Sequence, residues 1–355
     1  MKKVLLDIKK IIIFVCVLLK YLIEYGVNTY ILYSVVIVIL FFEFLRVFKI
    51  LKGNKKIVKS FVFLILVVIS VVVYKDINLL ITFALALTLV NSDIKDFLKN
   101  FMISSSTMYI ITICLYFLGI LKDNSLIRIS SNGYITRHSL GFSHPNCVFM
   151  FYIPIVLCAY ILEENKKKFY VIFSVLSIIL YKLSLSRTGI YCIGMLFILD
   201  LIKEKVDCKK IIGFLPLIFF GISYFVAVKY GTYKDNAINI LLSNRLYAWD
   251  RIIENANMFT IFGSNVLEKV YLDNFYLAMV YRCGFYSTLL YYFILIFGVK
   301  NIDDKKVHIS IIVFMIYGLA ESNTLIGSIN FTLAFLLYSI IQGKFELGGE
   351  SSDRK

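Results

Sequence analysis

The sequence predicts an all-α polytopic membrane protein that crosses a bilayer about twelve times. Apolar residues make up 60% of the chain and charged residues only 17%, too few to cover a water-facing surface. The mean hydropathy is +0.82. Apolar runs recur along nearly all 355 residues, with lysine and arginine clustered between them. We therefore expect one integral membrane domain over residues 1–355.

The individual spans follow from the length that a bilayer requires. A hydrocarbon core about 30 Å thick needs roughly 20 helical residues, because a helix satisfies its own backbone polar groups. The apolar runs predict helices near residues 8–24, 29–47, 59–75, 77–92, 101–120, 145–162, 169–185, 188–203, 210–228, 273–298, 307–325 and 326–342.

The charges between the spans predict the topology. A cytoplasmic N-terminus, with sides alternating from there, places most lysines and arginines in the cytoplasm, as membrane proteins prefer. Both termini are then inside, and the two longest loops, 121–144 and 229–272, are extracytoplasmic. Long loops in a compact protein usually carry function. The predicted functional face is therefore the outer one.

Several functional classes are excluded by pattern. The basic residues behind the net charge of +15 lie in short clusters between apolar runs, where they determine membrane topology. Nucleic acid is therefore not an expected partner. The seven cysteines show no paired spacing, which argues against a zinc site or a disulfide framework. Nucleotide-binding, metalloprotease, serine-hydrolase and Asp-x-Asp motifs are missing. We expect chemistry without metal or cofactor.

Arg187 stands in a very short connection between two apolar runs, within the sequence LSLSRTG. A charge at a membrane edge is costly, and the guanidinium fork suits phosphate recognition. The alternative is an interfacial arginine that extends its charge to the head groups.

The stretch TRHSLGFSHPN, residues 136–146, contains two of the three histidines just before a predicted span. Pro145 fits the first turn of a helix. His144 could serve as a general base, because histidine titrates near neutral pH. The alternative is helix capping, with Ser143 or Asn146 satisfying the backbone at the helix start.

The second loop contains SNRLYAWD, residues 243–250, with the only tryptophan and apolar residues at helical spacing. It predicts an interfacial amphipathic helix, whose basic residues bind either lipid head groups or a diphosphate. Asp273 and Asn274 open the next span, where an Asp-Asn pair also makes a good helix cap. Glu321 is expected on the same outer face.

The series TRHSLGFSHPN, LSLSRTG, SNRLYAWD, FGSN and LDNFYLAMVYRCGF resembles the Wzy-type polysaccharide polymerases of bacterial surface polymer synthesis. The resemblance covers residues 128–285 and is carried by the motifs together. It implies a multi-pass enzyme of the bacterial cytoplasmic membrane that joins oligosaccharide repeat units carried on undecaprenyl diphosphate. The implied partners are these lipid-linked oligosaccharides, membrane lipids, a flippase and a chain-length regulator.

Two other functions stay open. Related O-antigen ligases use the same donor, but typically have histidine where this chain has Asp273, which favours a polymerase. A flippase or transporter would instead place its polar groups near the bilayer midplane, often within internal repeats.

The residue types fit the roles that such a transfer needs. Arg187 and Arg245 would bind the diphosphate, and either His144 or Asp273 would accept the proton of the acceptor hydroxyl. The remaining candidates, expected to contact or orient substrate, are Arg137, Asn146, Asn274 and Glu321.

Overall fold

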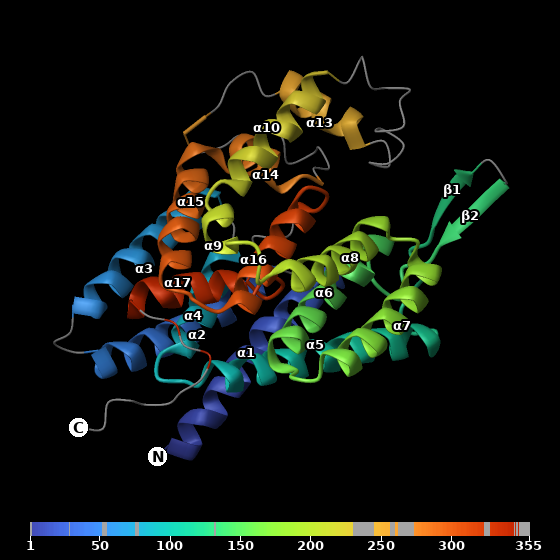
Figure 1. Ribbon diagram of the computed structural model, residues 1–355. Helices are drawn as coiled ribbons and strands as arrows, with labels where there is room; N and C mark the ends of the chain where they lie inside the picture. Colours follow the sequence, from blue (N-terminus) through green and yellow to red (C-terminus); the bar gives the residue numbers. More distant parts are fainter. Residues whose placement is uncertain are drawn as a thin grey trace. The chain divides into compact units, whose positions relative to one another are not determined.

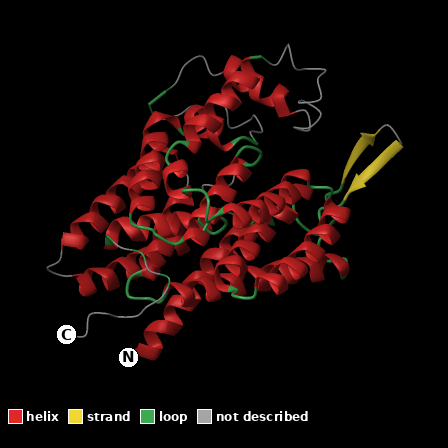
Figure 2. Cartoon of the chain, in the orientation of Figure 1, coloured by secondary structure: helices red, strands yellow, loops and turns green. Residues whose placement is uncertain are grey.

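The computed structural model describes residues 2–27, 29–51, 55–74, 78–130, 133–229, 245–255, 260–261, 273–322, 327–343, 345 and 347. Within these ranges the chain is mostly helical (Figure 2). The elements, all labelled in Figure 1 except η2, are α1 Lys2–Glu24, α2 Thr29–Leu51, α3 Lys55–Tyr74, α4 Asn78–Leu89, α5 Ile94–Phe117, β1 Leu126–Ser130, β2 Gly133–Arg137, α6 Pro145–Leu162, α7 Lys166–Ser184, α8 Arg187–Ile202, α9 Cys208–Ile212, α10 Leu215–Val228, α13 Arg245–Asn255, α14 Phe275–Leu277, the π-helix η2 Ala278–Arg282, α15 Gly284–Lys300, α16 Lys305–Gly318 and α17 Thr332–Gln342.

The helices follow the predicted spans closely, but their lengths differ from what twelve crossings require. Among the described residues, two helices are long and apolar enough to cross a membrane, α5 and α6. The 12 residues of α4 rise only about 18 Å, against a hydrocarbon core of about 30 Å. The helical class is confirmed. By this measure two spans are supported and not twelve, and the larger number stays a prediction.

The chain divides into two compact units. Unit 1 comprises residues 1–53, 84–202 and 346–355, and unit 2 comprises residues 54–83 and 203–345. The expectation of one continuous membrane domain stays a prediction.

Unit 1 is organised around α6, which contacts α5, α7 and α8. Residues 145–161 of α6 are almost all buried, as expected for a helix that is apolar on every face. The approach of α8 to α6 is close at Gly189, where an added Cβ would lie 2.0 Å from Cγ of Phe149. A glycine is therefore required at this crossing.

The predicted outer loop 121–144 contains an antiparallel hairpin, which departs from the expected all-α fold. In the register of β1 and β2, Ile127 pairs with Thr136 and Ile129 with Tyr134. These β-branched and aromatic residues favour extended backbone. The sequence predicted only a loop here, so this short sheet was not expected. Figure 2 shows its two strands in yellow.

Unit 2 packs α15 against α17 and α3, and α10 against α13 and α14. A Cβ added at Gly298 of α15 would lie 2.8 Å from Cβ of Leu336 in α17, so the two backbones are in close contact. The start of α13, the residues just before α14 and the residues just after α16 carry the candidate site described next.

Candidate functional site

Arg245 joins two carboxylates in unit 2. Its Nε lies 2.8 Å from Oδ2 of Asp273, and its Nη2 donates to Oε1 of Glu321 at 3.0 Å. The side chains are 11%, 15% and 5% exposed for Arg245, Asp273 and Glu321. Three of the residues predicted from sequence therefore form one nearly buried ionic cluster.

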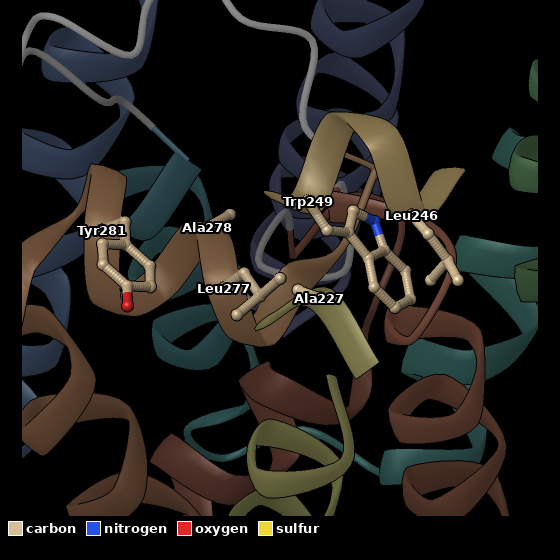
Figure 3. Close-up of a cluster of buried hydrophobic side chains, with 6 residues drawn as sticks. All are labelled: Ala227, Leu246, Trp249, Leu277, Ala278 and Tyr281. Carbon is tan, nitrogen blue, oxygen red and sulfur yellow. The ribbon is translucent and has the colours of Figure 1, made fainter. Parts of the chain in front are cut away.

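The helix α13 fixes the position of Arg245. The predicted amphipathic helix is confirmed, because α13 begins at Arg245 and buries Leu246 and Trp249. These two side chains pack on Ala227 of α10 and on Leu277 (Figure 3). An apolar contact and an ionic contact thus hold the same helix, which leaves the guanidinium little freedom.

Asn274 holds the other side of the cluster. Its Oδ1 accepts a hydrogen bond from the backbone N–H of Leu277, which caps α14. Its Nδ2 donates to Oγ of Ser223 at 2.9 Å and to the carbonyl of Leu319 at 3.0 Å. Asn274 is fully buried and bonded to protein at both ends of its amide. These bonds fix the backbone next to Asp273, and the expected contact of Asn274 with substrate stays a prediction.

Arg245 is the cation of this cluster, and its guanidinium contacts the carboxylates of both Asp273 and Glu321. Burial lowers the pKa of Arg245, but the nearby charges of Glu321 and Asp273 outweigh it and raise that pKa above its ordinary value. Arg245 therefore stays protonated and neutralises part of the carboxylate charge.

In unit 1, Arg137 connects the end of β2 to two other segments. Its Nη2 donates to Oδ1 of Asn146 at 2.7 Å, and its Nε donates to the carbonyl of Ser184 at 3.2 Å. The backbone N–H of His138 also donates to the carbonyl of Leu183 at 3.0 Å. Arg137 and Asn146 are thus brought together, and they join the hairpin to the helices.

His144 is the N-cap of α6, directly before Pro145 at the helix start. Its Nδ1 accepts a hydrogen bond from the backbone N–H of Asn146 at 3.0 Å. A nitrogen that accepts a hydrogen bond carries no proton, so the neutral ring carries its proton on Nε2. A side-chain cap is present at this helix start, but it is His144 and not the expected Ser143 or Asn146. The role of His144 as a base stays a prediction.

Arg187 is the first residue of α8 and is partly buried. The turn before it is tight, because Leu185 has a left-handed backbone with φ of 50°. The carbonyl of Ser184, which accepts from Arg137, belongs to the same turn. The structure therefore ties the Arg187 turn to the 136–146 stretch within unit 1.

Asp123 and Ser223 were not predicted from the sequence to have a role. Asp123 accepts from the backbone N–H of Ser139 at 2.8 Å, and its Oδ2 lies 2.6 Å from Nδ1 of His138, which closes the base of the hairpin. Ser223 holds Asn274. The only sequence signal for Ser223 was a small polar residue inside an apolar run.

In the part of the chain that the structure describes, no group of three or more His, Cys, Asp or Glu residues is arranged to bind a metal ion. The FGSN motif, residues 262–265, lies outside the described residues. The expectation of metal-free chemistry stays a prediction.

Comparison with known proteins gives no match: no protein-family model, no curated protein and no solved structure matches this chain.

Proposed function

We propose that this chain is a polysaccharide polymerase, a metal-independent glycosyltransferase of the bacterial cytoplasmic membrane. It moves a growing glycan from undecaprenyl diphosphate to a hydroxyl of the next lipid-linked repeat unit. The proposal includes about twelve crossings, cytoplasmic termini and a site on the outer face. The observation that carries it is the cluster of Arg245, Asp273 and Glu321, which holds a partly exposed carboxylate in a fixed position.

The reaction needs one base. The hydroxyl oxygen of the acceptor attacks the anomeric carbon of the donor, and the bond from that carbon to the diphosphate oxygen breaks. The electron pair leaves on the diphosphate, and the hydroxyl proton passes to a carboxylate. We assign this role to Asp273, which is 15% exposed, over Glu321, which is 5% exposed. The lone pair on Nδ1 of His144 is already engaged by Asn146.

Arg245 takes a different role from the diphosphate binding expected from sequence. Its guanidinium faces the carboxylates of Asp273 and Glu321 in the same cluster. Arg245 instead acts as a positioning residue that keeps Asp273 ionised and aligned. The expectation that Arg187 binds the diphosphate stays a prediction from its sequence context at a predicted membrane edge.

The test is an assay with purified full-length protein in vesicles of phosphatidylethanolamine and phosphatidylglycerol. Synthetic undecaprenyl-diphosphate repeat units are added, and the products are separated by size. We expect a ladder of glycans that grows with time. Transfer to a lipid A core without a ladder would indicate a ligase, and movement of the lipid-linked sugar across the bilayer without new bonds would indicate a flippase. Either result would overturn the proposal.

A further inference from the structure

An apolar pocket lies in unit 2 next to the chain segment that carries Asp273. Its walls come from α10, α14, η2 and α15, and its volume is about 580 Å³. Ligand pockets commonly enclose roughly 300–1,000 Å³. Phe275 and Tyr276 form part of the wall and directly follow Asn274 in the chain. The pocket therefore adjoins the ionic cluster through the backbone at the start of α14.

The wall of this pocket offers hydrocarbon rather than polar partners. The hydroxyl of Tyr276 donates to the carbonyl of Met315 at 2.7 Å, and the hydroxyl of Thr288 donates to the carbonyl of Gly284 at 2.9 Å. Both groups are thus engaged by the protein itself. The other lining residues are aliphatic or aromatic, apart from two tyrosine hydroxyls. Such a wall selects an apolar ligand, because an unpaired buried polar group would be costly.

The side chains at the pocket also include exposed apolar groups. Leu217, Phe285 and Leu289 line it, and each is more than half exposed. Contiguous exposed apolar surface marks contact with a membrane or a ligand. A hydrocarbon chain could therefore reach the pocket without crossing a polar surface.

The backbone of the wall departs from a regular helix. Met279 and Val280 belong to η2, a π-helix, and such turns occur frequently at functional sites. The next helix begins beside it, where the backbone N–H of Phe285 donates to the carbonyl of Thr260 at 3.0 Å. Thr260, one of the described residues of the second long loop, is thus attached at the pocket.

We propose that this pocket binds the isoprenoid chain of a polyprenyl diphosphate, with the diphosphate-linked sugar directed towards Asp273. The inference rests on the proposed function and adds the site at which the isoprenoid tail of the donor binds. A bilayer is as apolar as the pocket, so binding depends on the shape of the van der Waals contacts and not on the removal of water. One pocket takes one chain, whereas a bilayer phospholipid carries two.

The test uses full-length protein in the same vesicles and a geranylgeranyl diphosphate with a diazirine at the end of its tail. After illumination, the labelled peptide is identified by mass spectrometry. We expect the label at Met279 or Val280. Leu289→Trp should lower the labelling about tenfold, which corresponds to about 1.4 kcal/mol in affinity. The matched control is Ile296→Trp, because Ile296 is an exposed residue of α15 outside the pocket wall, and it should label as wild type.

Three results would overturn the inference: a label outside the pocket wall, equal labelling in Leu289→Trp, or equal competition by dioleoyl phosphatidylglycerol and unlabelled geranylgeranyl diphosphate. The wild-type label keeps the test decisive if Leu289→Trp does not fold, and Val280→Phe provides a second obstruction. Labelling at the pocket without a glycan ladder would support isoprenoid binding there and contradict the polymerase activity. A glycan ladder from protein that is labelled outside the pocket would support the polymerase activity and contradict isoprenoid binding at the pocket.

Discussion

Arg245 holds Asp273 through an ion pair of 2.8 Å between Nε and Oδ2, and the same guanidinium reaches Glu321 with its Nη2. The cation lies on α13, whereas its two partners lie before α14 and after α16. One side chain therefore joins three segments of unit 2.

Replacing Asp273 tests the base directly. We expect Asp273→Asn to lower the rate of glycan elongation about 10²–10⁴-fold, because general base catalysis contributes on that order. The amide keeps the shape of the side chain but does not take up the proton. Glu321→Gln is the matched variant, and its effect should be smaller because Glu321 is more buried. The measurement is the initial rate of ladder formation, and a larger loss in Glu321→Gln would move the base to that residue.

Removing the cation tests the docking of α13. We expect Arg245→Gln to destabilise unit 2 by about 3–5 kcal/mol, since it leaves two carboxylates without their partner. Trp249, the only tryptophan of the chain, packs beside Leu246 against α10 and Leu277. Its fluorescence emission should therefore shift to longer wavelength when α13 detaches from these residues. Arg251→Gln on the same helix is the control, because Arg251 is exposed and should leave the emission unchanged. Identical spectra for all three proteins would contradict the role given to Arg245.

Two substitutions of His144 distinguish its role as a helix cap from a role in catalysis. His144→Ala should destabilise the protein by about 1 kcal/mol, because α6 loses its N-cap. His144→Asn should restore stability, since asparagine is a good N-cap, and it should keep full elongation activity. Thermal unfolding in detergent and the ladder assay measure the two effects. A stable but inactive His144→Asn protein would return the base to His144.

The base of the hairpin should respond to acid. Burial raises the pKa of Asp123, but hydrogen bonds from His138 and from Ser139 outweigh it and hold that pKa below its ordinary value. A carboxylate with a lowered folded pKa stabilises the fold fully above about pH 4 and loses this contribution as the pH falls through the folded pKa. Hydrogen exchange at the Ser139 amide should therefore accelerate below about pH 4, beyond the intrinsic change of the chemistry. Asp123→Asn should show no such transition.

Glycine positions in α8 provide a matched pair for packing. Gly189→Ala would place a Cβ 2.0 Å from Cγ of Phe149, so α8 must move from α6, at a cost of about 1–3 kcal/mol. Gly194→Ala on the same helix meets nothing within 4 Å and should stabilise by about 0.5–1 kcal/mol through helix propensity. The difference in unfolding temperature measures the contact, and equal temperatures would show that the two helices do not pack at Gly189.

Features that depend on neighbouring residues could be predicted from the sequence. Apolar runs located the helices, Pro145 indicated the start of α6, and the apolar spacing around Trp249 predicted α13, because helix signals repeat within a few residues. The cap at Asn274 could be anticipated for the same reason.

Which polar groups come into contact depends on how distant segments pack. Arg245 and Glu321 are separated by 76 residues, and no local pattern encodes such a pair. The bond from Arg137 to the Ser184 carbonyl, the approach at Gly189 and the hairpin likewise depend on how distant segments pack. Local periodicity specifies an element and its buried face, whereas the roles of Arg245, His144 and Asp273 depend on which partners packing brings within hydrogen-bonding distance.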